Sequence, residues 1–211
     1  MLATRNPHKI VELRAILVEA LGAGAGDLDE AVVGLDGFDV PDVVEIGTTF
    51  AANALLKARA VAEATGLASL ADDSGLAVDV LGGAPGVFSA RWSGRHGDDA
   101  GNVRLLLGQL GDVPDDERGA AFVCAVALVT PDGEEVVEHG RLAGTLEREP
   151  RGTGGFGYDP VLRVHGSTRT LAELDPGEKN AISHRSQAMR AVVPALRGLL
   201  LTTHPPDDPS A

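Results

Sequence analysis

The sequence predicts an α/β fold built as a single domain. The chain has 211 residues and 44% of them are hydrophobic, which suffices for one substantial core but not for two full-size domains. Strand-like and helix-like segments alternate from the first residues onward, and a strong turn between two apolar runs indicates a long antiparallel hairpin. We therefore expect one domain over residues 1–203, followed by a disordered tail over 204–211.

The first half of the chain is expected to alternate strands with helices. Asn6 and Pro7 are typical of a helix N-cap and of the first helical position, and Gly66 is typical of a helix end. In chain order the expected elements are a strand over 1–4, a helix from Pro7 to a glycine-rich stop over 22–26, a strand over 31–35, a helix over 49–65 and a strand over 67–71 that ends at two acids.

The second half contains the predicted hairpin and a final helix. Pro131, Asp132 and Gly133 form a turn signal between two runs with strand character. In chain order the expected elements are a helix over 98–110, hairpin strands over 120–129 and 134–146, a short strand near 160–164 and a helix from about 183 to 200.

Composition excludes several classes of partner. The formal net charge of −13 argues against a nucleic-acid surface, because binding a phosphate backbone calls for a basic patch. No apolar run approaches the roughly 20 residues of a membrane helix, and basic residues precede any stretch that could serve as a signal peptide. We therefore expect a cytoplasmic protein with a small-molecule partner. The single cysteine, Cys124, lies in an apolar run and is interpreted as a core residue.

The segment around the first helix start is a candidate phosphate site. The N-terminus of a helix leaves backbone N–H groups unpaired and carries partial positive charge, and Lys9 adds a full charge. The alternative is an ordinary capped helix with Lys9 in solvent. The residues of this segment are Thr4, Arg5, Asn6, Pro7, His8 and Lys9.

Acidic residues supply candidate metal ligands. Asp72 and Asp73 are adjacent, and because neighbouring strand residues face opposite sides, only one of them is expected to reach a given cleft. One could bind magnesium and orient or deprotonate water, while the other bonds nearby backbone; the alternative is a solvated turn. Glu45 is a second candidate ligand, although acids ahead of helices are also favourable dipole partners.

A glycine-rich loop and the start of the last helix are candidates for base recognition. Residues 152–159 combine backbone freedom with Phe156 and Tyr158, in a chain with only 3% aromatic residues. Such rings suit stacking on a flat base, and the alternative is a loop whose rings pack inward. Lys179 and residues 183–185 add cations and donors near another helix terminus.

Taken together, these segments resemble the inosine triphosphate pyrophosphatase-like family along nearly the whole chain. The blocks that carry the resemblance are ATRNPHK at 3–9, TF, NA and KA within 49–58, ADDSGL at 71–76, LGGAPG and SAR within 81–91, GGFGYDP at 154–160 and SHR at 183–185. The chain departs from the family in two places. Few residues precede Ala3, so the first strand is expected to be short, and Ala52 stands where many relatives carry glutamate.

The resemblance implies a fold, an activity and a set of site residues. The fold would be a homodimeric α/β structure with a long central mixed sheet, flanking helices and two lobes around a nucleotide cleft. The activity would be hydrolysis of XTP, dITP and ITP to the monophosphate and pyrophosphate with Mg²⁺. Asp73 would be the catalytic proton acceptor and a metal ligand, with Glu45 as a further ligand. The substrate contacts would be Thr4, Arg5, Asn6, Pro7, His8, Lys9, Lys57 and Ser74 for the triphosphate or sugar, and Phe156, Gly157, Tyr158, Asp159, Lys179, His184 and Arg185 for the base.

The expected reaction is attack of a water on the α-phosphorus, with Mg²⁺ bridging the triphosphate and Asp73, which activates the water. Lys9 and Lys57 would stabilise the charge on the leaving group. Two alternatives remain at this point. One is a pyrophosphatase for other modified nucleotides, such as methylated pyrimidines, and the other is a sensor that binds such nucleotides without cleaving them.

Overall fold

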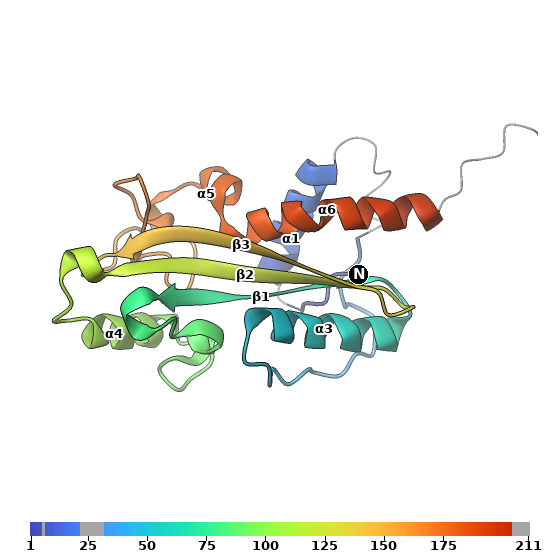
Figure 1. Ribbon diagram of the computed structural model, residues 1–211, viewed down its shortest axis with the longest axis horizontal. Coiled ribbons are helices and arrows are strands. Elements are labelled where there is room, and N and C mark those ends of the chain that lie inside the picture. The colour runs from blue at the N-terminus through green and yellow to red at the C-terminus, as the bar shows by residue number, and fades with distance from the viewer. Residues whose placement is uncertain (6, 22–31, 204–211) are drawn as a thin grey trace, which may run out of the picture.

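The fold is described from a computed structural model of the chain (Figure 1). It covers residues 1–5, 7–21 and 32–203, so the predictions for Asn6, for the glycine-rich stop at 22–26 and for the tail at 204–211 fall outside the described residues. The helices and strands are α1 (Pro7–Leu21), α3 (Phe50–Thr65), β1 (Ser69–Val78), α4 (Asp99–Gln109), β2 (Gly119–Val129), β3 (Glu135–Leu146), β4 (Leu162–Val164), α5 (Pro176–Ile182) and α6 (His184–Thr203).

A long central sheet organises the molecule, as predicted for this α/β class. Its strands lie in the order β1-β2-β3-β4 and each neighbouring pair is antiparallel. The parallel component of the expected mixed sheet is a single bridge between Leu2 and Leu70. The strand expected over 1–4 is therefore reduced to this bridge.

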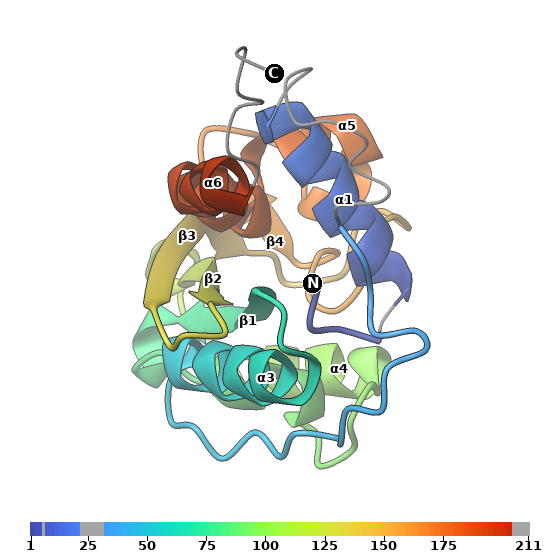
Figure 2. The same cartoon turned by 90° about the vertical axis from the view of Figure 1, so that its right-hand side faces the viewer.

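Helices cover both faces of the sheet (Figure 2). α1 and α6 lie on one face, where they pack against Cys124, Val126 and Leu128 of β2. α3 lies on the other face against Ala125 and the next alternate residues of β2. This alternation follows from the two-residue period of a strand, which sends successive side chains to opposite faces. Any pair of adjacent residues on a central strand is thereby divided between the α1/α6 layer and the α3 layer.

The ends of α3 confirm the predicted helix over 49–65. The hydroxyl of Thr49 accepts a hydrogen bond from the N–H of Ala52 at 3.1 Å, and Gly66 ends the helix with φ of 65°. Both are common solutions to the unpaired backbone groups at helix ends. The buried face of α3 places Ala54 and Ala58 in the core, and Lys57 lies at the pocket described below.

Two predictions for the first half of the chain were wrong. The strand expected at 31–35 is not formed over the described residues 32–35, although Val33 accepts a backbone hydrogen bond from Leu2 at 2.8 Å. The strand expected to end at 71 instead continues to Val78, because every residue of β1 has a partner on β2. Asp72 and Asp73 consequently lie within a strand. The described part of the chain contains no helix with the length and apolarity that crossing a bilayer requires.

The contact between β3 and α6 generates a stability prediction. A methyl group at Gly140 would collide with the backbone oxygen of His184 and lie 2.7 Å from the nitrogen of Ala188. Because both obstacles are backbone atoms, we expect Gly140→Ala to lower the free energy of unfolding by about 2–3 kcal/mol. Chemical denaturation measures this change.

A matched control lies on the solvent side of α6. Nothing stands within 4 Å of a methyl group built at Gly198. Gly198→Ala is expected to raise the free energy of unfolding by about 0.5–1 kcal/mol, because alanine loses less backbone entropy in a helix. Equal stability of the two variants would contradict the close approach of α6 to β3.

Candidate functional site

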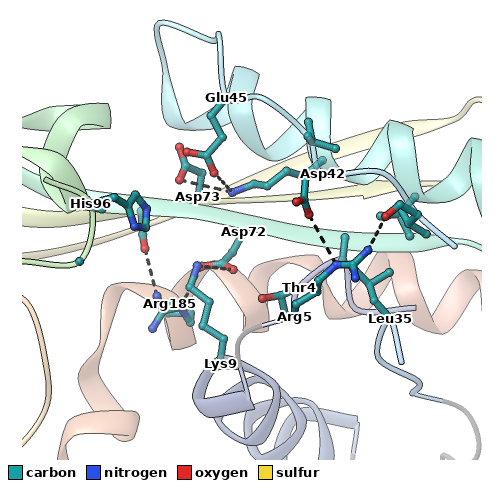
Figure 3. A pocket seen from close by; sticks show the side chains of 18 of the residues that line it. Thr4, Arg5, Lys9, Leu35, Asp42, Glu45, Asp72, Asp73, His96 and Arg185 are labelled. Carbon is teal, nitrogen blue, oxygen red and sulfur yellow. Dashed lines mark hydrogen bonds and ion pairs between the residues drawn. The ribbon is translucent and has the colours of Figure 1, made fainter. Parts of the chain in front are cut away.

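A pocket of about 960 Å³ opens beside β1, between the α1/α6 layer and the α3 layer (Figure 3). A volume of this size suits a ligand as large as a nucleotide. The polar side chains that line it come from the residues before α1 and its first turn, the segment before α3, α3 itself, β1, the segment ahead of α4 with its first residue, and α6. They are Thr4, Arg5, Lys9, Asp42, Glu45, Lys57, Asp72, Asp73, Ser74, His96, Asp99 and Arg185.

The two aspartates of β1 face opposite sides of the strand, as their adjacency predicted. Figure 3 shows Asp72 directed toward Lys9 and Arg185, and Asp73 directed toward Glu45. The expectation that only one of them reaches a given cleft was wrong, because both line the same pocket beside β1, the terminal strand of the sheet order. The pocket therefore has two halves, each built around one carboxylate.

The carboxylate of Asp72 joins two cationic side chains. The ammonium of Lys9 donates to both of its oxygens at 3.0 Å, and Nε of Arg185 donates to Oδ2 at 3.1 Å. Arg185 also donates from Nη2 to the hydroxyl of Ser74 at 3.1 Å. The side chains of Asp72 and Arg185 are each only 2% exposed. The sequence suggested backbone partners for this aspartate, and the structure supplies charged side chains.

Charge, not solvent, keeps Asp72 ionised. Burial alone would raise the pKa of Asp72, but Lys9, Arg185 and Lys57 outweigh it and hold the pKa well below its usual range. The surrounding cations thus favour the ionised form of Asp72 inside the pocket.

The carboxylate of Asp73 is held from the α3 side. Nδ2 of Asn53 donates to Asp73 Oδ2 at 3.0 Å, and the ammonium of Lys57 lies 3.5 Å from Oδ1. The same ammonium donates to Glu45 at 2.9 Å. Asn53 also accepts a hydrogen bond from the N–H of Gly47 at 2.7 Å, which ties the segment that carries Glu45 to α3. A methyl group at Gly47 would press on this amide oxygen, so only glycine allows the approach.

The two acids that share Lys57 titrate differently. Burial raises the pKa of Asp73, and Lys57 and Asn53 offset the rise only in part. For Glu45 burial also opposes ionisation, but Lys57 prevails and lowers the pKa. The pKa of Lys57 is raised because the nearby carboxylates outweigh its burial. Asp73 is therefore the stronger proton acceptor of the pair.

The donor set of Glu45 and Asp73 fits a magnesium ion. Two carboxylates already converge on one cationic group, the ammonium of Lys57, at 2.9 Å and 3.5 Å. Magnesium is usually held by one or two carboxylates together with waters and substrate phosphates. Within residues 1–5, 7–21 and 32–203 no cluster of three or more histidine, cysteine or acidic side chains forms a metal cage. An ion bound here would therefore depend on the ligand for part of its coordination.

Phe156 gives the pocket an exposed aromatic face. Its side chain is 52% exposed and lines the pocket, with the ammonium of Lys179 at 4.7 Å and the guanidinium of Arg185 at 5.8 Å from the ring centroid. Asp159 fixes this loop by accepting hydrogen bonds from the N–H of Phe156 at 2.8 Å and from Lys179 at 2.6 Å. Asp99 also holds the loop, because its carboxylate accepts a hydrogen bond from the N–H of Gly157 at 2.7 Å.

Tyr158 and His184 are buried beside the pocket. The Tyr158 hydroxyl donates to the backbone oxygen of Ser89 at 2.9 Å, so of the two rings in this loop only Tyr158 packs inward. His184 stacks on Phe122 with 4.9 Å between ring centroids. Burial, followed by the charges of Arg185 and Lys179, lowers the pKa of His184 to about 3. Its imidazole is therefore neutral near pH 7 and donates from one nitrogen only.

The structure brings most of the predicted site residues to one pocket. Those that line it are Thr4, Arg5, Lys9, Glu45, Lys57, Asp73, Ser74, Phe156 and Arg185. Arg5 points toward the 40–42 segment, where it donates to the backbone oxygen of Val40 and lies 3.8 Å from Asp42. Gly157, Tyr158, Asp159, Lys179 and His184 lie behind the lining. Asn6 and the side chains of Pro7 and His8 are outside the described residues.

Several pocket residues were not predicted as site residues. Asp72 was considered as one of two adjacent acids but was not assigned a site role, and its partners lie 63 and 113 residues away in the chain. Asn53 belongs to a motif that carried the family resemblance, so a signal existed for it. His96, ahead of α4, and Asp99, the first residue of α4, also line the pocket, and the sequence offered no comparable motif there.

Comparisons with known proteins show which family the chain resembles in sequence and fold. The sequence profile of the Ham1 family matches residues 1–195. A protein of Streptomyces coelicolor named dITP/XTP pyrophosphatase is 61% identical over 201 residues, covering 95% of this chain and 98% of its own. The solved structures that resemble the chain include the following two. One, a nucleoside-triphosphatase / dITP/XTP pyrophosphatase of Mycobacterium abscessus, has 54% identity, a TM-score of 0.73 and coverage of 92% and 97%. The other, a HAM1 protein of Coxiella burnetii, has 41% identity, a TM-score of 0.81 and coverage of 93% and 97%.

The Lys57 contact predicts how Asp73 titrates. Lys57→Met removes the positive charge that lowers the pKa of Asp73, so this pKa is expected to rise further. The carboxyl would then stay protonated to higher pH and lose its proton-accepting form over a wider acidic range. Carbon-13 NMR of the aspartate carboxyls against pH measures the change.

The matched control is Lys179→Met, which removes a lysine that pairs with Asp159. This variant is expected to leave the pKa of Asp73 unchanged. An unchanged or lower pKa of Asp73 in Lys57→Met would contradict the assigned contact.

Proposed function

Because the chain belongs to the Ham1 family, we propose that it is a nucleoside triphosphate pyrophosphatase for non-standard purine nucleotides. Its substrates are XTP, dITP and ITP, which it converts to the monophosphate and pyrophosphate. This reaction removes them from the nucleotide pool before they enter DNA or RNA. The observation that carries the proposal is a single pocket that combines the cations Lys9 and Lys57, the proton acceptor Asp73 and the exposed ring of Phe156.

Asp73 is the proposed catalytic base. Its raised pKa makes it a better proton acceptor than an ordinary surface aspartate. It takes a proton from a water whose oxygen forms a bond to the α-phosphorus. The bond from the α-phosphorus to the bridging oxygen breaks, and pyrophosphate leaves with the electron pair. Lys9 and Lys57 stabilise the negative charge that accumulates on this leaving group.

Magnesium is part of the proposal, with Glu45 and Asp73 as the residues that would hold it. A bound ion would neutralise part of the triphosphate charge and polarise the phosphoryl oxygens. We also propose that the enzyme acts as a homodimer in the cytoplasm. The homodimer rests on the family resemblance, and the cytoplasmic location rests on the composition of the chain.

Selection of the base combines stacking with hydrogen bonding. The exposed ring of Phe156 offers a face on which a purine can stack. The family resemblance assigns recognition of a 6-oxo group to His184 and Arg185. Arg185 lines the pocket and His184 lies behind it, so a donor from Arg185 directed at the 6-oxo group would be the direct contact and would favour hypoxanthine and xanthine. Adenine presents a 6-amino group instead, which offers such a donor no acceptor. Guanine shares the 6-oxo group, so its rejection requires a contact with its 2-amino group.

Asp73→Asn tests the reaction and its base together. The variant keeps the shape of the side chain but cannot accept the proton, so pyrophosphate release is expected to fall by about a thousandfold or more while thermal unfolding stays close to that of wild type. The assay follows pyrophosphate release from dITP, XTP, dATP and dGTP with magnesium, with and without a chelator.

The outcomes separate the competing functions. Magnesium-dependent release from dITP and XTP alone supports the proposal. Faster release from methylated pyrimidine nucleotides would favour the related modified-nucleotide pyrophosphatase. Binding of dITP without release would favour a sensor, and near-normal turnover in Asp73→Asn would defeat the assignment of the base.

Phe156→Leu tests the stacking contact. Stacking of a base on an aromatic ring contributes about 1–3 kcal/mol, so KM for dITP is expected to rise about tenfold with a smaller change in kcat. The matched control is Phe88→Leu, because Phe88 is similarly exposed and has Arg91 above its ring but does not line the pocket. Similar KM values for both variants would argue against base stacking on Phe156.

A further inference from the structure

One buried charge in the pocket has no role in the proposed reaction, the carboxylate of Asp72. We infer that Asp72 is a positioning residue that couples the triphosphate contact of Lys9 to the base contact of Arg185. This inference rests on the proposed function, because it assigns those two contacts to opposite parts of one nucleotide. Asp72 itself would touch neither part.

The contacts of Asp72 join three separate elements. Asp72 lies near the middle of β1, Lys9 comes from the first turns of α1 and Arg185 from the start of α6. The Lys9 ammonium is 3.0 Å from both carboxylate oxygens, and Nε of Arg185 is 3.1 Å from one of them. A single oxygen, Oδ2, therefore contacts both cations. Movement of either cation changes the position of the atom that holds the other.

Burial makes this arrangement costly unless the charges are matched. A carboxylate that is 2% exposed must be balanced by partners, since an unpaired buried charge is strongly unfavourable. Lys9 and Arg185 supply that balance. The carboxylate in turn restricts the rotamers of these two long side chains before a ligand binds, so binding costs less side-chain entropy. A lysine ammonium has three donors, so contact with a carboxylate is compatible with contact to a phosphate.

Arg185 extends the coupling to the aromatic face. Its guanidinium carbon lies 5.8 Å from the centroid of Phe156, and its Nη2 donates to Ser74 at 3.1 Å. The base end of the pocket is thus connected to Lys9 through one carboxylate. Asp73 takes no part in this connection, because it faces Lys57 and Asn53 on the other side of β1.

Asp72→Asn tests the coupling with two probes that each represent part of the nucleotide. Inorganic triphosphate reports the phosphate contacts and deoxyinosine reports the base contacts, and both are titrated by calorimetry without metal. The neutral amide keeps the shape of the side chain but loses the charge that orients both cations. We expect the dissociation constants of both probes to rise at least fivefold, and KM for dITP to rise more than kcat falls.

Single-site variants provide the contrast. Lys9→Met is expected to weaken triphosphate binding at least fivefold and deoxyinosine binding by less than that, and Arg185→Lys is expected to do the reverse. Asp73→Asn, the same substitution one residue further along β1, is expected to leave deoxyinosine binding within twofold of wild type. The double variant of Asp72→Asn with Lys9→Met should bind triphosphate no worse than Lys9→Met alone.

Three results would overturn the inference. They are wild-type affinity of Asp72→Asn for either probe, tighter binding of triphosphate by that variant, and additive losses in the double variant. Failure of the proposed function gives a different pattern, in which the wild-type protein binds both probes but releases no pyrophosphate from dITP. The probe comparison then still decides the role of Asp72.

A measurement on the wild-type protein guards against a variant that does not fold. The Nε–H resonance of Arg185, assigned by its loss in Arg185→Lys, is followed by NMR while inorganic triphosphate is added. Coupling through Asp72 predicts that this resonance shifts in the wild type and stays in place in Lys9→Met. Absence of a shift in the wild type, at triphosphate concentrations that saturate binding, would overturn the inference without any Asp72 variant.

Discussion

Consecutive residues of a strand must point to opposite faces of its sheet, and the pocket is built around this constraint at Asp72 and Asp73. On one side Asp72 contacts Lys9 of α1 and Arg185 of α6. On the other side Asp73 contacts Asn53 and Lys57 of α3. Each helical layer therefore contributes its cations to a different carboxylate. Because β1 is the terminal strand of the sheet order, both groups nevertheless open into one cavity.

The chain carries a net charge of −13, yet its pocket suits a polyanion. Local pairing resolves this contrast, since net charge says little about the potential inside a cleft. Lys9, Lys57 and Arg185 each contact a carboxylate in the pocket. Their charges are thus held in place by side chains of the chain itself. The charges of these cations and of the carboxylates they contact nearly cancel. When a phosphate ligand and a divalent cation bind together, the phosphates can replace carboxylates as partners of the lysines, and the divalent cation can replace a lysine as partner of a carboxylate.

Local signals in the sequence predicted local structure well. The helical pattern over 49–65, the Gly66 end and the turn at 131–133 identified α3 and the β2–β3 hairpin. Long-range pairing was beyond these signals. β1 continues through the acids because β2 pairs with all ten of its residues, a fact that no property of residues 69–78 alone contains. The partners of Asp72 are likewise set by the packing of α1 and α6 on the sheet. Motif resemblance recovered most of the pocket lining, but it could not separate the exposed Phe156 from the buried Tyr158.

Glu45 and Asp73 show how one shared cation can divide two acids between different tasks. Lys57 lies closer to Glu45, at 2.9 Å, than to Asp73, at 3.5 Å, and the Asp73 side chain is the more buried at 13% exposure against 31%. Attraction therefore prevails at Glu45 and lowers its pKa, whereas desolvation prevails at Asp73 and raises its pKa. A carboxylate that stays ionised is suited to a permanent role as a metal ligand. One that gains a proton more readily is suited to receive it from an attacking water, so the position of a single ammonium favours Asp73 as the base.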